Sequence, residues 1–290
     1  MTLRGQLLIN EPLARYTSWR IGGPAARLYQ PADLDDLAAF LKSLPEREPL
    51  LWLGLGSNTL IRDGGFNGTV IVTQGALTKI GHIGEWQVQA EAGVACAALA
   101  RYCARLGLTG LEFMAGIPGT VGGALRMNAG CFGGETWNWV ESVTTMDIKG
   151  HQRTRSTTDY QVGYRHVVGP EAEWFTGATF RLQAGDKETS LAKIRELLDS
   201  RAATQPTGEH NCGSVFRNPV GNHAGKLIES CQLKGFRIGD AMVSPKHANF
   251  IINVGQATAT DIEKLMRHVH AKVLETHGIQ LEPEVRIVGE

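Results

Sequence analysis

Two glycine-rich segments are the part of this sequence that most directly predicts chemistry. The longer segment begins at Ala115, and the shorter one follows the apolar residues 50–53. Their candidate ligand-binding residues are Gly116, Ile117, Pro118, Gly119, Thr120, Gly122, Gly123 and the nearby Asn128 in the first, and Gly54, Gly56, Ser57 and Asn58 in the second. Glycines leave backbone N–H groups accessible and allow the curled backbone of an anion-binding nest. One such segment is typical of tight turns, but two, nearly free of acidic residues, predict a diphosphate ligand.

Neither segment fits a common nucleotide-binding motif. After Gly54 and Gly56 the third glycine of a dinucleotide fingerprint is missing, and residues 60–65 do not continue as an amphipathic helix. No Gly-Lys-Ser/Thr ending of a P-loop occurs. The sequence therefore predicts a diphosphate site of another kind.

Composition narrows the class of protein. The chain has 290 residues, 42% of them hydrophobic, with 29 basic and 29 acidic residues, so we expect two or three domains and neither a nucleic-acid-binding nor a membrane surface. Five cysteines without a CxxC pair, and no signal-like or membrane-spanning apolar run, predict a cytoplasmic protein without disulfides. The histidines lack metal-ligand spacing, so we expect no metal site. We also expect a monomer.

Apolar periodicity predicts an α+β protein. Helices are expected at 33–44, 95–106, 190–202, 225–233 and 259–277, and strands at 50–53, 68–73, 87–91, 142–148, 174–182, 250–254 and 281–288. Residues 204–211 are polar and helix-breaking, which predicts a connection into a last module.

Three short segments carry side chains capable of catalysis. They hold Tyr164 and Arg165, Cys212 to Asn218, and Glu284. Each has a plainer interpretation: Arg165 as a surface side chain on Tyr164, Ser214 as a turn residue, and Glu284 as the exposed side of a strand. Spacing alone does not join them into one site.

Together these segments resemble the UDP-N-acetylenolpyruvoylglucosamine reductase family. The resemblance covers nearly the whole chain, through ordered motifs at residues 17–24, 54–58, 116–123, 128–130, 164–165, 213–219 and 282–286. It implies an α+β fold with a two-part FAD-binding region like that of vanillyl-alcohol oxidases (residues 1–74 and 75–188), and a substrate-binding α+β domain (residues 189–290). The final strand would return Glu284 to the active site. Residues 54–66 contain no histidine, so we expect the FAD to be noncovalent.

The resemblance also implies a reaction and residue roles. NADPH would reduce FAD, and the enolpyruvyl group of a UDP-sugar would then take the hydride, in the synthesis of the peptidoglycan precursor UDP-N-acetylmuramate. Arg165 would hold the carboxylate, Glu284 would stabilise the enol, and Ser214 would protonate the carbanion-like carbon. Cys212 is the alternative proton donor, because its side chain would lie on the same side of the backbone as that of Ser214 if residues 212–214 are extended. Candidate substrate ligands are Tyr164, Arg217, Asn218, Lys226 and His247.

Some features depart from the family or leave alternatives open. Val167 replaces a frequent serine, Trp19 replaces a common phenylalanine, and no tyrosine follows Tyr164, which is typical of the branch that lacks a tyrosine-bearing loop over the site. A flavin oxidase of the same fold and a nucleotide-binding regulatory module remain the alternatives. We also expect valine at Gly119 or Gly122 to weaken FAD retention, by steric intrusion and by excluding positive φ.

Overall fold

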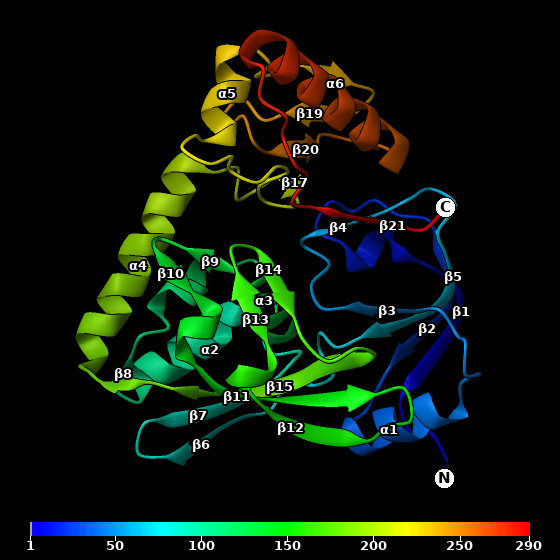
Figure 1. Cartoon of the computed structure of the whole chain (residues 1–290), viewed down its shortest axis with the longest axis vertical. Helices are drawn as coiled ribbons and strands as arrows, with labels where there is room; N and C mark the ends of the chain where they lie inside the picture. Colours follow the sequence, from blue (N-terminus) through cyan, green and yellow to red (C-terminus); the bar gives the residue numbers. More distant parts are fainter. Residues whose placement is uncertain (1) are drawn as a thin grey trace. The chain divides into compact units, whose positions relative to one another are not determined.

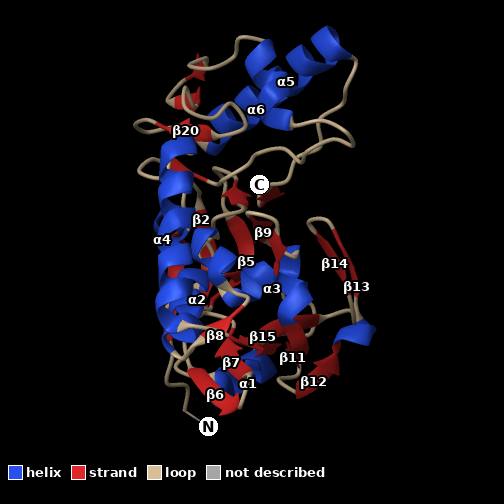
Figure 2. Cartoon of the chain, turned by 90° about the vertical axis from the view of Figure 1, so that its left-hand side faces the viewer, coloured by secondary structure: helices blue, strands red, loops and turns tan. Residues whose placement is uncertain are grey.

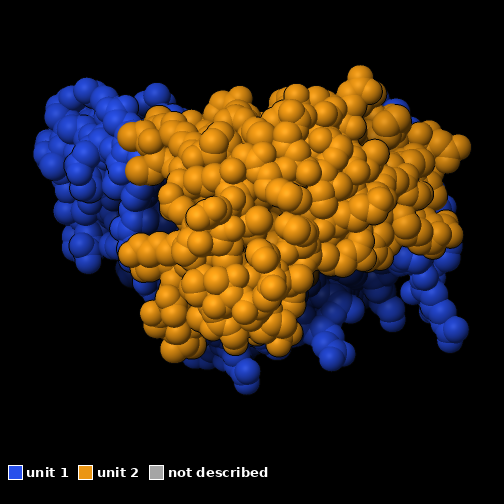
Figure 3. All heavy atoms as spheres, turned by 90° about the horizontal axis from the view of Figure 1, so that it is seen from above, with its two compact units in different colours: residues 1–8, 27–55, 68–200 blue, residues 9–26, 56–67, 201–290 orange. Residues whose placement is uncertain are grey.

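The computed structural model describes residues 2–290, which divide into two compact units (Figure 3). Unit 1 consists of the residues up to 8 together with 27–55 and 68–200, and unit 2 consists of 9–26, 56–67 and 201–290. Each unit therefore combines segments that are distant in the sequence. The predicted domains 1–74, 75–188 and 189–290 remain a sequence-based proposal.

The N-terminal part of the chain forms a four-stranded sheet (Figure 1). Its order is β1 (Gln6–Pro12), β2 (Pro24–Gln30), β5 (Phe66–Val72) and β3 (Leu50–Leu53), and β3 runs parallel to β5. Helix α1 (Leu34–Ser43) begins at Asp33, whose carboxylate accepts a hydrogen bond from the Asp36 amide at 2.9 Å. Leu37, Phe40 and Leu41 pack against Tyr29 and Ile71 of the sheet. The predicted helix at 33–44 is confirmed.

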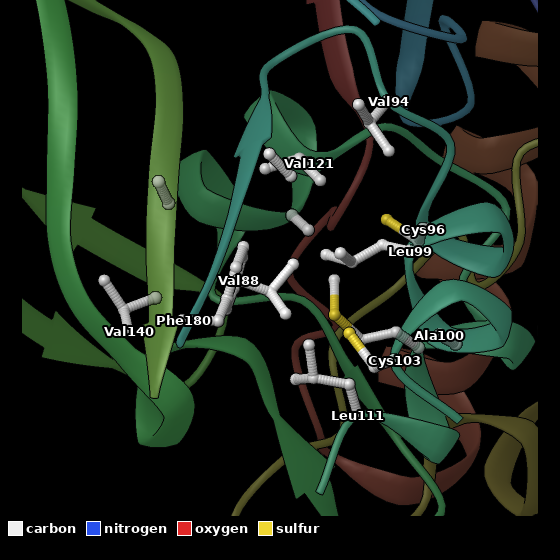
Figure 4. Close-up of a cluster of buried hydrophobic side chains, with 14 of the residues drawn as sticks. Val88, Val94, Cys96, Leu99, Ala100, Cys103, Leu111, Val121, Val140 and Phe180 are labelled. Carbon is white, nitrogen blue, oxygen red and sulfur yellow. The ribbon is translucent and has the colours of Figure 1, made fainter. Parts of the chain in front are cut away.

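A five-stranded antiparallel sheet forms the second part of unit 1. Its order is β12 (Gln152–Ser156), β11 (Val140–Asp147), β15 (Glu173–Arg181), β7 (Gln87–Glu91) and β6 (Ile80–Gly84). Helices α2 (Cys96–Arg105) and α3 (Val121–Met127) pack on it, and Leu99 and Val121 meet Val88 and Phe180 in one core (Figure 4). The glycine-rich segment 115–124 therefore runs into a helix that buries Val121, Ala124 and Leu125.

Short hairpins complete unit 1. They are β9 (Gly130–Cys131) with β10 (Gly134–Glu135) and β13 (Gln161–Gly163) with β14 (His166–Val168). Strand β16 (Gln183–Ala184) pairs with β8 (Leu108–Thr109), which lies far from it in the sequence. Helix α4 (Lys187–Thr204) follows Asp186, which accepts a hydrogen bond from the Thr189 amide at 2.8 Å. Short 3₁₀ helices span Glu112–Gly116, Thr136–Trp139 and Thr157–Asp159.

Unit 2 has its own sheet and hydrophobic core, and Figure 2 shows the helices and strands of the chain by type. The antiparallel order is β17 (His210–Asn211), β20 (Ile251–Asn253), β19 (Ala241–Val243) and β18 (Arg237–Ile238), with helices α5 (Ala224–Ser230) and α6 (Ala259–His277) and a 3₁₀ helix at Leu13–Tyr16. Strand β4 (Thr59–Ile61) pairs in parallel with β21 (Arg286–Val288). Trp19 is 1% exposed, and its indole N–H donates to the Ile251 carbonyl at 2.7 Å, so the residue that departs from the family's phenylalanine has a hydrogen-bond partner.

The predicted last strand is shorter than expected. Residues 281–288 were predicted as one strand, but β21 covers only Arg286–Val288. Pro283 forms an isolated bridge with Phe216, and the Glu284 amide donates to the Val215 carbonyl at 2.8 Å. Glu284 therefore pairs with the Ser214 segment before the chain joins β4. Among the helices of residues 2–290, none combines the length and apolar character that a membrane crossing requires.

Candidate active site

The two glycine-rich segments touch each other within unit 1. A Cβ placed on Gly54 would lie 2.2 Å from the Thr120 hydroxyl oxygen and 3.2 Å from its Cβ. Thr120 is 2% exposed, and its Oγ1 has no hydrogen-bond partner among the described residues. A buried hydroxyl without a partner costs about 1–3 kcal/mol, so this oxygen is suited to a ligand that supplies the missing bond.

Gly119 and Gly122 lack the backbone conformation that was expected of them. Neither has a positive φ, and of the predicted cofactor-binding glycines only Gly56 does, at 63°. A Cβ on Gly122 would lie 2.9 Å from that of Ala92, and its amide donates to the Ala92 carbonyl at 2.9 Å. The Gly119 carbonyl accepts from the Cys96 amide at 3.0 Å. The expectation of positive φ at these two positions was wrong: Gly122 packs on Ala92 within α3, and Gly119 accepts the bond from Cys96 at the start of α2, both without positive φ.

Several other predicted cofactor ligands lie in the same loop, and Asn128 already has partners within unit 1. Gly116 is buried, Ile117 is half-buried and Pro118 is exposed. Asn128 ends α3 with φ 42°; its side-chain amide donates to Glu135 at 2.9 Å and to the Gly163 carbonyl at 3.2 Å, and its Oδ1 accepts from the Trp137 amide at 3.1 Å. Asn128 thus links the glycine-rich segment to the β13–β14 hairpin.

Arg165 lies at the turn of that hairpin. Gly163 pairs with His166, so Tyr164 and Arg165 form the two-residue loop, and Arg165 has a φ of 53°. Its guanidinium donates to the Gly130 carbonyl at 2.8 Å and lies 5.1 Å from the centre of the half-exposed Tyr164 ring. Left-handed backbone at a non-glycine residue costs about 1 kcal/mol and is concentrated at functional sites. The stacking foreseen for a plain surface arginine is present, together with a hydrogen bond that fixes the guanidinium.

Ser214 and Glu284 are brought together in unit 2. The Val215 carbonyl, next to Ser214, accepts from the Glu284 amide at 2.8 Å, and the Arg217 amide donates to the Glu282 carbonyl at 2.9 Å. Asn58 supports the same segment, because its side-chain amide donates to the Glu284 carbonyl at 3.0 Å and its backbone carbonyl accepts from the Arg286 amide at 3.0 Å. Both Ser214 and Glu284 are half-buried.

Cys212 does not share the environment of Ser214. Gly213 between them has a φ of 82°, so the stretch is not extended and the condition for a shared side fails. The thiol is 5% exposed, and burial, reinforced by the negative charge of Glu284, raises its pKa well above the ordinary value. The thiol is therefore a poorer acid here than an accessible cysteine.

A cavity of about 340 Å³ opens beside Ser214. Four residues predicted from the sequence line it: Ser214, Asn218, Lys226 and His247. Burial lowers the pKa of His247, and nearby Lys234 lowers it further, so its imidazole is neutral at pH 7. Arg217 is not in the lining, and its guanidinium lies 3.8 Å from the Glu282 carboxylate.

The cavity also contains residues that the sequence analysis missed. His223, Glu229 and Lys246 line it as well. Glu229 lies three positions after Lys226 on α5, so helical spacing predicts that the two share a face. Nothing local in the sequence identified Lys246, whose ammonium donates to the Ala202 carbonyl. Within residues 2–290 no group of three or more potential metal ligands occurs.

Two family models match this chain. The C-terminal domain of UDP-N-acetylenolpyruvoylglucosamine reductase matches residues 205–288, and an FAD binding domain matches residues 25–156. The first contains the cavity and the second contains both Gly54 and Thr120.

Named relatives match over nearly their full length. UDP-N-acetylenolpyruvoylglucosamine reductase of Legionella pneumophila (strain Corby) is 60% identical over 99% of this chain and 94% of its own. The Alkalilimnicola ehrlichii protein of the same name is 60% identical over 99% of this chain and 96% of its own length. The crystal structure of UDP-N-acetylenolpyruvylglucosamine reductase (MurB) from Thermus caldophilus superimposes with a TM-score of 0.83 at 33% identity, over 99% of this chain and 100% of its own. These similarities confirm the predicted α+β fold class with its FAD-binding part, and FAD as the cofactor.

Proposed function

Because this chain belongs to the UDP-N-acetylenolpyruvoylglucosamine reductase family and is therefore a flavin-dependent oxidoreductase, we propose that it uses NADPH to reduce UDP-N-acetylglucosamine enolpyruvate. The product would be UDP-N-acetylmuramate, a precursor of peptidoglycan. The observation that supports this most is the pairing of Ser214 and Glu284 through the Val215 carbonyl beside a cavity with two lysines.

Bound FAD supplies hydride transfer between NADPH and the enolpyruvyl double bond. The residues that would hold it are the touching segments at Gly54 and Thr120, with Gly56, Ser57, Gly116 and the backbone that follows. The unpartnered Thr120 hydroxyl, which lies over Gly54, fits a ligand that supplies a hydrogen bond at the meeting point of the two segments. The resemblance and the absence of histidine at residues 54–66 support a dissociable cofactor.

In this proposal each catalytic side chain has one task. Arg165 grips the carboxylate of the enolpyruvyl group with its planar fork, and its bond to Gly130 limits the guanidinium's motion. Ser214 donates the proton to the carbon beside that carboxylate, which is basic enough to accept it from a hydroxyl. Glu284, in its protonated form, donates a hydrogen bond to the enol oxygen.

The cavity residues would bind the UDP-sugar. Lys226 and Lys246 provide positive charge for the diphosphate, while Asn218 and neutral His247 provide hydrogen bonds. We propose Arg217 and Tyr164 as further contacts. The scattered cysteines, without a CxxC pair in the sequence, support the proposal of a cytoplasmic location, and we propose a monomer.

Anaerobic half-reactions test this function. The purified yellow protein should be bleached by NADPH and should regain its absorbance when the enolpyruvyl sugar is added, with UDP-N-acetylmuramate as product. If oxygen restores the colour with release of peroxide while the enolpyruvyl sugar does not, the protein is a flavin oxidase and the proposal fails.

A further inference from the structure

The backbone that carries Ser214 lacks the support of a regular strand. Gly213 has a φ of 82°, which breaks the extended conformation, and Phe216 forms only an isolated bridge, with Pro283. The direction of the Ser214 side chain therefore depends on the contacts of the next two residues, Val215 and Phe216.

Asn249 supplies those contacts. Its Oδ1 accepts from the Phe216 amide at 3.0 Å, and its Nδ2 donates to the Phe216 carbonyl at 2.8 Å. Its backbone carbonyl accepts from the Val215 amide at 2.9 Å. One residue thus bonds both polar groups of Phe216 and the amide of Val215, as a neighbouring strand would.

Burial raises the free-energy cost of breaking the bonds between Asn249 and Phe216. Asn249 is 4% exposed, and a buried amide that loses a partner costs about 1–3 kcal/mol, so the Phe216 backbone is held in one register. Because the Val215 carbonyl accepts from Glu284, the same clamp also fixes the distance between the Ser214 and Glu284 segments.

We propose that Asn249 is a positioning residue that aims the Ser214 hydroxyl, acting through the backbone of Val215 and Phe216. This inference rests on the proposed function, in which Ser214 donates the proton. Both polar groups of the Asn249 side chain are bonded to Phe216. Asn249 therefore acts on the reaction through Ser214, although it also borders the cavity.

The test uses Asn249→Asp in the FAD-bound enzyme. Aspartate keeps the size of the side chain but turns an oxygen toward the Phe216 carbonyl, which removes one bond and adds repulsion. We expect unchanged flavin content, unchanged bleaching by NADPH and an unchanged Kd for the enolpyruvyl sugar, but reoxidation slowed by about 10- to 100-fold, as for a misplaced catalytic group.

A double variant separates positioning from a general structural effect. In a Ser214→Ala background, Asn249→Asp should slow reoxidation by less than about 3-fold more, because two residues that act as one unit are not additive. Asn253→Asp is the matched control: this asparagine is 7% exposed on β20, and its amide donates to Trp19 rather than to the Ser214 segment. It should reoxidise at the normal rate.

Three results would overturn the inference: normal reoxidation in Asn249→Asp while Ser214→Ala is slow, full additivity of the two changes, or equal slowing in Asn253→Asp. Normal reoxidation in Ser214→Ala would instead refute the proposed proton donor. If Asn249→Asp does not fold, the rate of reoxidation in Asn249→Ser and hydrogen exchange in the unaltered enzyme test the inference instead. The Phe216 amide should then exchange slowly, and rapid exchange would exclude the clamp.

Discussion

Replacement of Gly54 by alanine tests whether the two glycine-rich segments form one cofactor cradle. The new Cβ would lie 2.2 Å from the Thr120 Oγ1, which must retreat by about 1.2 Å to reach ordinary contact at 3.4 Å. Thr120 cannot retreat easily, because it is 2% exposed, bridges to Ala95, and its carbonyl accepts from the Ala124 amide at 2.9 Å.

The expected cost follows from that overlap. Overpacking of a buried site costs about 1–3 kcal/mol, which corresponds to a fall in Tm of about 2–5 °C for a chain of this size. Because the displaced hydroxyl is a proposed FAD contact, the affinity for FAD should fall by about 10- to 100-fold. Thermal unfolding of the apoprotein and fluorescence titration with FAD measure the two effects separately.

Two companion variants make this prediction refutable. Gly208→Ala is the control, since a Cβ there meets no atom within 4 Å. Gly54→Ala with Thr120→Ala should recover most of the lost Tm, because the closest atom is gone and only the Thr120 Cβ at 3.2 Å remains tight. If Gly54→Ala keeps the Tm and the FAD affinity of the unaltered protein, the contact between the two segments is not what the geometry indicates.

Three further predictions concern the catalytic and substrate-binding residues. Arg165→Lys should lower turnover by about 100-fold with normal flavin content, because an ammonium cannot reproduce the fork; steady-state kinetics with turnover near normal would make Arg165 a surface residue. Cys212→Ala should reoxidise normally, and a stalled second half-reaction would identify the buried thiol as the donor. Folding lowers the pKa of His247, so the unfolded chain binds this proton more readily than the folded chain does. The contribution of neutral His247 to stability is therefore present above pH 6.5 and is lost as the pH falls through the folded-state pKa. Denaturant unfolding at pH 7.5, 6.5 and 5.5 should therefore show a weaker acid destabilisation in His247→Gln, and an identical slope would contradict this.

Local patterns were sufficient for most elements of the fold. Helix α6 was predicted at its observed bounds, because the Thr258 capping box and the left-handed Gly278 mark both ends of an apolar periodicity. Strand β7 was predicted equally well. The hairpin around Arg165 was missed because its two strands have three residues each and its turn contains no glycine.

The site was predictable only in part. The sequence identified Ser214, Asn218, Lys226 and His247, which share one cavity. The sequence could not show that residues 281–285 lie outside β21 and that Glu284 bonds to Val215 instead, since this depends on contacts between segments about 70 residues apart. Nor could it show that a Cβ on Gly122 would meet Ala92 and one on Gly54 would meet Thr120, because the neighbours of a glycine are set by the fold and not by the local sequence.

Anaerobic stopped flow of Ser214→Ala tests the assignment of the proton donor most directly. NADPH should bleach the flavin at the normal rate, and the enolpyruvyl sugar should restore its absorbance at least about 100-fold more slowly than in the unaltered enzyme, the usual share of a general acid. The flavin should accumulate in its reduced form during turnover. Reoxidation at the normal rate would contradict the assignment of Ser214 as the proton donor.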